Sequence, residues 1–266
     1  MSQGDKYAIL RRCRRVWAVA SIHSQAQRLT ALHRSLEEQF QPGDRLVYLG
    51  NATGHGTAAT ETIDELLAFR RRIIARPGMF AADVAHLRGS QEEMWFKLLQ
   101  LQLAPNPREV LDWMLAQGVD ATIAAYGGDI GQGRALAAQG AVALTRWTGS
   151  LRAAMQRHAG HEARMTALRR AAYTDDATLL FVHAGLDPNR PLTAQNDSLW
   201  WNAGGFGRID HAFDGFRRVI RGFDRAHAGI RVNPFTTSID AGCGFGGPLV
   251  AACFDPSGEI VAIIEA

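Results

Sequence analysis

The stretch RLVYLGNATGHG, residues 45–56, joins a short apolar run to a glycine-rich loop. The apolar residues 46–49 predict a buried strand, and the glycines predict a tight loop at the carboxyl edge of a sheet, where α/β proteins bind ligands. The loop offers Asn51, Thr53 and His55 but no carboxylate. The sequence therefore contains a loop of the ligand-binding type that lacks charged groups to contact a ligand.

The composition limits the size of the core and the kind of partner. With 266 residues, of which 47% are hydrophobic, the chain can bury a large core, and we expect one domain over residues 1–266. Lys and Arg number 29 against 26 Asp and Glu, and the net charge of +3 is too small to indicate a nucleic-acid partner. The basic run RRCRR at 11–15 fits a solvent-exposed entry to a first strand.

The apolar segments are short and the cysteines are few. No segment approaches 18 consecutive apolar residues, so we expect no membrane span. Cys13, Cys243 and Cys253 are widely spaced and form no zinc-binding pattern, which suits a reduced, cytoplasmic protein. The segment CGFGGP that begins at Cys243 is interpreted as a tight loop between strands, because the sequence places no base beside the cysteine.

Hydrophobic periodicity predicts an α/β protein. Strand-like runs occur at 16–20, 46–49, 179–182, 218–221, 236–239, 249–254 and 260–264. Helical periodicity occurs at 25–40, 58–74, 92–103 and 108–116, and an alanine- and arginine-rich block at about 133–172 also reads as helix. This order predicts two packed sheets with helices outside them, and a helical insert at about 104–175.

Three other patterns receive plain structural interpretations. GGDIGQG at 127–133 lacks the preceding strand and the Lys-Ser/Thr ending of a phosphate loop, so we interpret it as a turn. His158 and His161 are spaced i, i+3 in the helical block, and with no third ligand evident we interpret them as a solvent-exposed face. Trp200 and Trp201 fit packing in a core better than stacking on a base.

Six segments at the ends of the predicted elements form an ordered set: ASIHS at 20–24, GNATGHG at 50–56, LRGSQEE at 87–93, FVHAGLDPNRPL at 181–192, IRGFD at 220–224 and SIDAGCGFGGPLVA at 238–251. In their order and spacing the chain resembles the calcineurin-like metallophosphoesterases. The similarity is to the bacterial branch that holds serine/threonine protein phosphatases and symmetrical bis(5′-nucleosyl)-tetraphosphatases, and GVDATIAAYG at 118–127 also resembles that branch. The resemblance implies a two-sheet sandwich in four layers, αββα, and a hydrolase acting on phosphoric esters or anhydrides.

The resemblance also implies a pair of divalent metal ions of the Mn, Fe or Zn type, which bind a phosphate and generate the attacking hydroxide. In the first loop, the family's aspartate aligns with Ser21, whereas its histidine is retained as His23. In the second loop, the aspartate that bridges the two ions aligns with Asn51. The second aspartate of that loop aligns with Gly54, and its phosphate-binding arginine aligns with His55.

The third loop keeps three residues of the family but differs at the two positions that bind metal and protonate the leaving group. Arg88, Gly89 and Glu92 match the family, and we interpret Arg88 as a residue that fixes its loop. The metal-binding asparagine aligns with Ser90. The catalytic histidine, which protonates the leaving group in the family, aligns with Gln91.

Of the last two positions that the family uses for metal binding, one is retained and one is replaced. His183 is retained, whereas the final metal histidine aligns with Phe223. A phosphate-binding arginine that follows Leu-Trp in the bacterial branch aligns with Asn202. The ten aligned positions are here called the vestigial cleft: Ser21, His23, Asn51, His55, Arg88, Ser90, Gln91, His183, Asn202 and Phe223.

The charge balance of the vestigial cleft argues against a metal pair. Two divalent ions bring four positive charges, and both carboxylates that the family uses to offset them are replaced. His23 and His183 serve different ions in the family, and phenylalanine at 223 offers no ligand atom. We therefore expect no metal cofactor, and His23 and His183 are the only ligand positions that are retained.

Three hypotheses about function follow. The leading hypothesis is a pseudophosphatase, a folded and metal-free relative that acts as a binding or regulatory module for an unknown protein. The second is a divergent phosphoesterase of the protein phosphatase or dinucleoside tetraphosphatase type, whose metal site is rebuilt from His55, His211, Asp224 or His227. The third is a sensor of a small phosphorylated ligand in the vestigial cleft. The ligand count favours an inactive protein.

Overall fold

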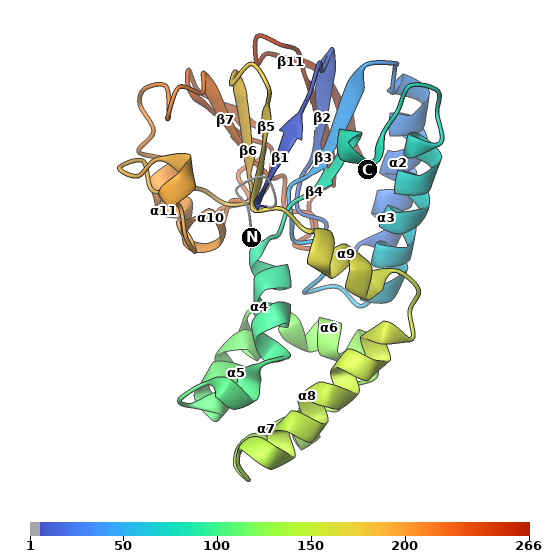
Figure 1. Ribbon diagram of the computed structural model, residues 1–266, viewed down its shortest axis with the longest axis vertical. Coiled ribbons are helices and arrows are strands. Elements are labelled where there is room, and N and C mark those ends of the chain that lie inside the picture. Colours follow the sequence, from blue (N-terminus) through green and yellow to red (C-terminus); the bar gives the residue numbers. More distant parts are fainter. Residues whose placement is uncertain (1–5) are drawn as a thin grey trace.

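The computed structural model describes residues 6–266 and contains two β-sheets packed face to face (Figure 1). The five-stranded sheet has the order β11-β10-β2-β3-β4, with β2 Arg15–Val19, β3 Asp44–Tyr48, β4 Val84–His86, β10 Val250–Phe254 and β11 Ile260–Glu265. The six-stranded sheet has the order β1-β5-β6-β7-β9-β8, with β1 Tyr7–Leu10, β5 Ala171–Thr174, β6 Leu179–Val182, β7 Arg218–Arg221, β8 Arg231–Val232 and β9 Thr236–Ser238. Both sheets mix parallel and antiparallel pairs.

Helices cover the outer faces of the sandwich and extend below it (Figure 1). The helices are α2 Ala26–Gln39, α3 Ala59–Ile74, α4 Ser90–Leu98, α5 Pro107–Ala116, α6 Val119–Ala125, α7 Ile130–Ala137, α8 Ala141–Gln156, α9 His161–Ala167, α10 Ser198–Trp201 and α11 Ala203–Phe206. Short 3-10 turns occur at Ala81–Asp83, Leu101–Leu103 and Leu192–Ala194. The two-sheet sandwich flanked by helices that the sequence predicts is therefore confirmed.

Alternation along β2 shows why the sheet is buried on both faces. Trp17 and Val19 belong to the apolar cluster between the five-stranded sheet and the helices α2 and α3. Val16 and Ala18 point the other way and belong to the cluster between the two sheets. Successive side chains of a strand face opposite sides, so an uninterrupted apolar strand indicates apolar surfaces on both. Each such large side chain contributes roughly 1.5–3 kcal/mol by burial.

The outer face of the six-stranded sheet has a thinner cover. Leu180, Val182 and Val219 of this sheet share an apolar cluster with Leu199 of α10 and Phe206 of α11. These two helices have four residues each, and loops complete the layer (Figure 1). The fourth layer therefore consists of short helices and loops.

The helices α4 to α8 have an apolar cluster of their own. Trp95 and Leu98 of α4 pack in it with Leu111 of α5 and with Leu144 and Trp147 of α8. This group of helices lies below the strand ends in the view of Figure 1. The helical segment therefore has an apolar core that is distinct from those of the sandwich, as expected for an insert.

Part of the predicted helical block is wrong. The block at about 133–172 contains the end of α7, then α8 and α9, and finally strand β5 at 171–174. Strand β5, Ala171–Thr174, begins with two alanines, which disfavour strands, but it pairs with β1 on one side and β6 on the other and is almost fully buried. The strands β1, β4 and β8 were not predicted either. Among residues 6–266, no helix is long and apolar enough to cross a membrane.

Candidate functional site: the vestigial cleft

Backbone hydrogen bonds tie the loops at the strand ends together. The backbone N–H of His23 donates to the carbonyl oxygen of Asn51 at 2.9 Å, which joins the loops after β2 and β3. The backbone N–H of Phe223 donates to the carbonyl oxygen of His183 at 3.0 Å, which joins the loops after β6 and β7. The Nδ1 atom of His183 donates to the carbonyl oxygen of Leu49 at 2.8 Å and links these two pairs of loops.

Six residues of the vestigial cleft line one pocket at this junction: His23, Asn51, His55, Ser90, Gln91 and Phe223. Ser21 and His183 are fully buried, with no exposed surface. No aspartate or glutamate is among the residues that line the pocket. The loops that the sequence singled out thus converge, and the pocket that they form has no carboxylate of its own.

The side chain of Asn51 is committed to the start of α4. Its Oδ1 atom accepts hydrogen bonds from the hydroxyl of Ser90 at 3.1 Å and from the backbone N–H of Gln91 at 2.9 Å. Its backbone has a φ of +51°, a left-handed conformation that asparagine tolerates better than most residues. The preceding Gly50 has a φ of +89°, and a Cβ atom there would lie 2.6 Å from the backbone nitrogen of Gly89. This close approach explains the glycine frame in the sequence.

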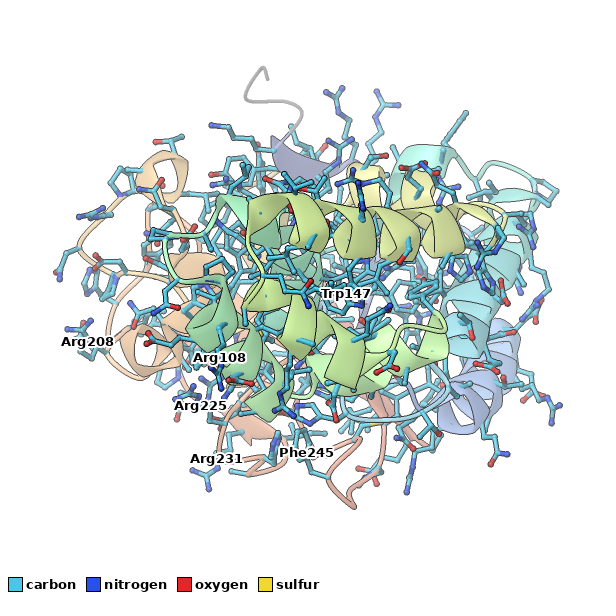
Figure 2. The ribbon with its side chains drawn as sticks, turned by 90° about the horizontal axis from the view of Figure 1, so that it is seen from below. Arg108, Trp147, Arg208, Arg225, Arg231 and Phe245 are labelled. Atoms are coloured by element: carbon cyan, nitrogen blue, oxygen red, sulfur yellow. The ribbon has the colours of Figure 1, made fainter. Side chains whose placement is uncertain are left out.

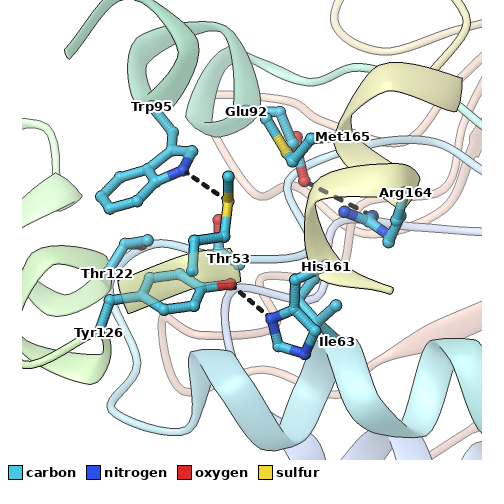
Figure 3. Close-up of a pocket in the computed structure, with 10 residues that line it drawn as sticks. Thr53, Ile63, Glu92, Trp95, Thr122, Tyr126, His161, Arg164 and Met165 are labelled. Atoms are coloured by element: carbon cyan, nitrogen blue, oxygen red, sulfur yellow. Dashed lines mark hydrogen bonds and ion pairs between the residues drawn. The ribbon is translucent and has the colours of Figure 1, made fainter. Parts of the chain in front are cut away.

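Glu92 holds the two central loops in place. Its carboxylate accepts hydrogen bonds from the backbone N–H groups of Asn51, Ala52 and Gly89 at 2.9, 2.8 and 2.9 Å. The guanidinium of Arg164 lies 3.9 Å from Oε1 of the same carboxylate (Figure 3). Glu92 is 1% exposed and is fully used in these contacts. The retained glutamate therefore acts on the shape of the cleft rather than on a ligand.

Aromatic rings and imidazoles fill the mouth of the cleft. The rings of His183 and Phe223 are stacked, with centroids 5.3 Å apart and an angle of 11° between planes. The ring of His23 has His55 and Phe245 as edge-on neighbours, each at 5.1 Å. Sequence reasoning missed Phe245, which lies in the loop interpreted only as an inter-strand turn. Its partly exposed ring beside two histidines could be recognised only after folding.

Several buried polar atoms in the cleft have no hydrogen-bond partner among the described residues: Oγ of Ser21, both ring nitrogens of His23, Nδ2 of Asn51, Oε1 of Gln91 and Nε2 of His183. Buried polar groups are otherwise paired in nearly all folded proteins. Burial lowers the pKa of His23 well below its ordinary value, and the nearby His55 and His183 lower it further. His23 is therefore neutral at pH 7, and these unpartnered atoms are uncharged donors and acceptors.

Arg88 and Asn202 do not line the pocket. Arg88 donates from Nη1 to the carboxylate of Glu93 at 3.0 Å, and its carbonyl oxygen accepts from Nε1 of Trp200 at 2.8 Å. These contacts favour the interpretation that Arg88 fixes its loop. Asn202 accepts from the backbone N–H of Gly205 at 2.9 Å and so caps α11. Its neighbour Trp201 lines the pocket instead.

The residues present do not fit a pair of divalent ions. Such ions prefer carboxylate or imidazole ligands, and the pocket presents amide, hydroxyl and aromatic groups beside two histidines of separate loops. Of the residues that a rebuilt site would use, His55 lines the pocket, Nδ1 of His227 contacts Asp240 at 2.9 Å, Asp224 forms an ion pair with Arg221 at 2.9 Å, and His211 lies on the surface. Among residues 6–266, the one cluster of three donors with suitable spacing lies elsewhere, on α3 and the turn before α9.

Comparison with solved structures assigns the fold. Over 98% of both chains, the structure is similar to a protein assigned as a diadenosine tetraphosphatase, with a TM-score of 0.59 and 19% identity. A serine/threonine phosphatase from Saccharomyces cerevisiae with similarity to human phosphatase PP5 gives a TM-score of 0.54 at 13% identity, over 98% of this chain and 83% of that one. A point mutant of a cold-active protein tyrosine phosphatase gives 0.51 at 13% identity, over 98% and 85%.

These similarities define the fold as that of the calcineurin-like metallophosphoesterases. No family model and no curated protein matches the sequence. The fold implied by the loop motifs is thus confirmed over nearly the whole chain. Because the sequence identities are low, these similarities support the fold alone.

Proposed function

We propose that this protein is a pseudophosphatase, a metal-independent binding module built on a metallophosphoesterase fold. The observation that carries the proposal is the stack of Phe223 on His183, with 5.3 Å between ring centroids. At the position where the resembled family has its last metal histidine, an apolar ring occupies the space beside one of the two retained histidines. Because the phenylalanine ring has no ligand atom, a small shift of the loop cannot restore a metal ligand at this position.

The charges around the cleft support the same proposal. Glu92 is close by, but its two oxygens already accept three backbone hydrogen bonds and face Arg164. Asn51 is neutral and its oxygen accepts two hydrogen bonds from the start of α4. Two adjacent cations would therefore repel each other with no free carboxylate to offset them.

The test combines an activity assay with metal analysis. We expect the purified protein to give no hydrolysis of p-nitrophenyl phosphate above the buffer rate in added Mn²⁺. We also expect fewer than two ions per chain, and no bound ion whose affinity changes in His23→Ala or His183→Ala. Metal-dependent hydrolysis that both of these substitutions abolish would contradict the proposal and support a phosphoesterase with a rebuilt site.

A second candidate function is the binding of a small phosphorylated ligand in the same cleft. It is favoured by the unpartnered polar atoms of His23, Asn51 and Gln91 and by Arg225, an exposed cation that lines the pocket. Figure 2 labels Arg225 in the lower half of that view. A guanidinium beside neutral donors is a common arrangement for phosphate recognition.

Titration with inorganic phosphate and with AMP, followed by calorimetry, tests this candidate. We expect saturable binding that Arg225→Ala weakens by at least about tenfold, since charge-assisted hydrogen bonds contribute roughly 1.5–3 kcal/mol. Arg208→Ala is the matched control, because Arg208 is also exposed but lies on a separate loop (Figure 2). Equal weakening by both substitutions would indicate a general charge effect and would remove the candidate.

A further inference from the structure

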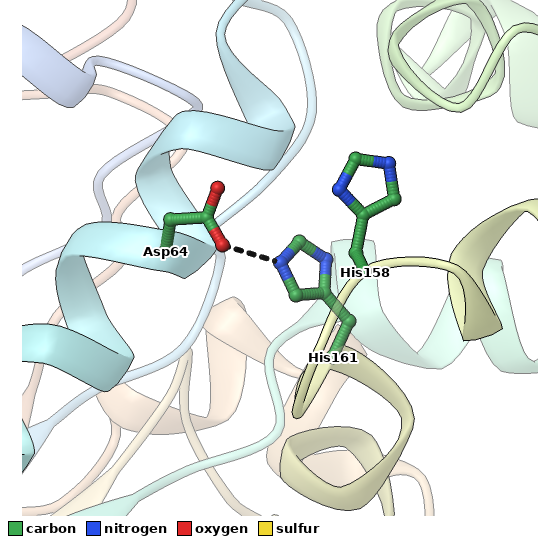
Figure 4. A group of neighbouring side chains, drawn as sticks. All are labelled: Asp64, His158 and His161. Atoms are coloured by element: carbon green, nitrogen blue, oxygen red, sulfur yellow. Dashed lines mark hydrogen bonds and ion pairs between the residues drawn. The ribbon is translucent and has the colours of Figure 1, made fainter.

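Two histidines and an aspartate meet between α3 and the turn that joins α8 to α9 (Figure 4), and none of the three lines the pocket of the vestigial cleft. Asp64 belongs to α3, His158 lies in the turn between α8 and α9, and His161 begins α9. One potential ligand atom from each lies within 4.8 Å of the other two. In the part of the chain that the structure describes, residues 6–266, this is the one such cluster of three.

A tight turn brings the two imidazoles together. Gly160, between them, has a φ of +86°, and a Cβ atom there would lie 3.0 Å from Cδ1 of Leu67 on α3. The turn therefore packs directly on α3, and the two rings lie 4.9 Å apart at an angle of 29°. The prediction of a solvent-exposed face is wrong for His161, which is 1% exposed. The third ligand was missed because Asp64 lies 97 positions from His161.

The surroundings of His161 are those of a metal-binding imidazole. Its Nδ1 lies 2.7 Å from the hydroxyl of Tyr126 (Figure 3), and its Nε2 lies 3.1 Å from Oδ1 of Asp64. The ring nitrogens of His158 make no hydrogen bond within residues 6–266.

We propose that Asp64, His158 and His161 bind one first-row divalent cation, with Zn²⁺ as the best match, and that the ion joins α3 to the turn between α8 and α9. Two imidazoles and a carboxylate with an open fourth position are a common zinc ligand set. Bond lengths of about 2.0–2.2 Å place tetrahedral donors about 3.3 Å apart. The Asp64–His161 pair is already at 3.1 Å, whereas the half-buried ring of His158, with a ring nitrogen within 4.8 Å of both partners, has to move closer when the ion binds.

Tyr126 is a positioning residue for this site. When the cation takes the lone pair of Nε2 of His161, the remaining ring proton is on Nδ1 and is donated to the hydroxyl oxygen of Tyr126. The cation displaces the hydrogen bond between Asp64 and His161 and leaves the carboxylate as a ligand. Loss of such an outer partner typically lowers metal affinity about 10–100-fold, so Tyr126→Phe provides a graded test.

The experiment is a titration of the chelator-stripped protein with ZnCl₂ in competition with a chromophoric chelator. We expect one tight Zn²⁺ per chain, and a loss of at least about tenfold in affinity in His158→Ala and in Asp64→Asn. Tyr126→Phe should give an intermediate loss. His211→Ala is the control, because its exposed imidazole contacts Asp210 at 2.6 Å without a second histidine nearby.

A thermal readout tests the proposed link between α3 and the turn. Zn²⁺ should raise the melting temperature of the unmodified protein and of His211→Ala, but not that of Asp64→Asn. Because the side chain of Asp64 is exposed, we expect Asp64→Asn to fold normally. Unchanged Zn²⁺ affinity in Asp64→Asn and His158→Ala would overturn the proposal, as would Zn²⁺ binding that depends on His23 or His55 instead. The proposed function of the cleft does not depend on either result.

Discussion

The ring of Phe223 lies nearly parallel to the ring of His183, at 11° and with 5.3 Å between centroids. The two residues follow neighbouring parallel strands, β6 and β7, and a backbone hydrogen bond joins them. An aromatic side chain thus packs against a retained imidazole where the resembled family needs two metal ligands.

Restoring the ligands should restore metal binding. The variant that combines Ser21→Asp, Asn51→Asp, Ser90→Asn, Gln91→His and Phe223→His should take up Mn²⁺, measured by elemental analysis after gel filtration. Asn51→Asp alone should bind none, because it adds one charge to a site that still lacks its other ligands.

The same variant should hydrolyse p-nitrophenyl phosphate at most weakly. It lacks the arginines that align with His55 and Asn202, and loss of one group that stabilises the transition state typically costs ~10²–10³-fold in rate. Adding His55→Arg should raise the rate more than Asn202→Arg, because His55 lines the pocket whereas Asn202 caps α11. Metal uptake by Asn51→Asp alone would show that the cleft is less degraded than we infer.

Glu92 should be required for stability. Glutamine at this position keeps one acceptor oxygen, so backbone N–H groups that now donate to the carboxylate lose their acceptor. We expect Glu92→Gln to lower the free energy of unfolding by about 3 kcal/mol, measured by urea denaturation. The control Glu61→Gln, at an exposed position of α3, should change it by less than about 0.5 kcal/mol. Similar costs for both would show that the carboxylate does not hold the loops.

Acid should destabilise the protein partly through His86. Burial lowers the pKa of His86 well below its ordinary value of 6.5, and both ring nitrogens lack a partner among the described residues. The unfolded chain protonates this histidine below about pH 6.5 while the folded chain does not. Stability therefore falls as the pH decreases from about 6.5 toward the lowered pKa.

Replacing the imidazole tests this contribution. His86→Phe keeps an aromatic ring beside Tyr48, with which His86 stacks at 4.6 Å. It should reduce the slope of unfolding free energy against pH by up to about 1.4 kcal/mol per pH unit, measured by urea denaturation between pH 7.5 and 5. The slope that remains belongs to other buried histidines such as His23. An unchanged slope would mean that His86 is protonated in the folded protein.

Gly50 should be sensitive to substitution because of its neighbours as well as its backbone. Gly50 and Gly78 both have positive φ, +89° and +76°, but a Cβ at Gly50 would lie 2.6 Å from the nitrogen of Gly89, whereas a Cβ at Gly78 would meet nothing within 4 Å. Gly78→Ala should cost about 1 kcal/mol for the left-handed conformation alone. Gly50→Ala should cost about 2 kcal/mol more by overpacking. Equal costs in thermal unfolding would show that the loops move apart freely.

Much of the fold could be predicted because its strong signals are local. The apolar strands at 16–20 and 46–49 are buried on both faces, and the ordered loop segments placed the chain in the right fold. The alanine-rich strand β5 could not be predicted, because its pairing with β1 joins residues more than 160 positions apart. Short segments of weak propensity follow such tertiary contacts rather than their own sequence. The single-domain division and the cytoplasmic location stay predictions.

The sequence by itself determined which chemical groups the cleft can offer, because the identity of Ser21, Asn51 and Phe223 does not depend on folding. That positions 21 and 51 carry no carboxylate could be read from it directly. Only the tertiary structure decided how those groups are used: the oxygen of Asn51 caps α4, Glu92 holds the loops, and the ring of Phe223 packs on His183. The physical reason is that hydrogen bonds and ring contacts need atoms within a few ångströms of each other, and the chain brings distant residues to that distance only when its core closes.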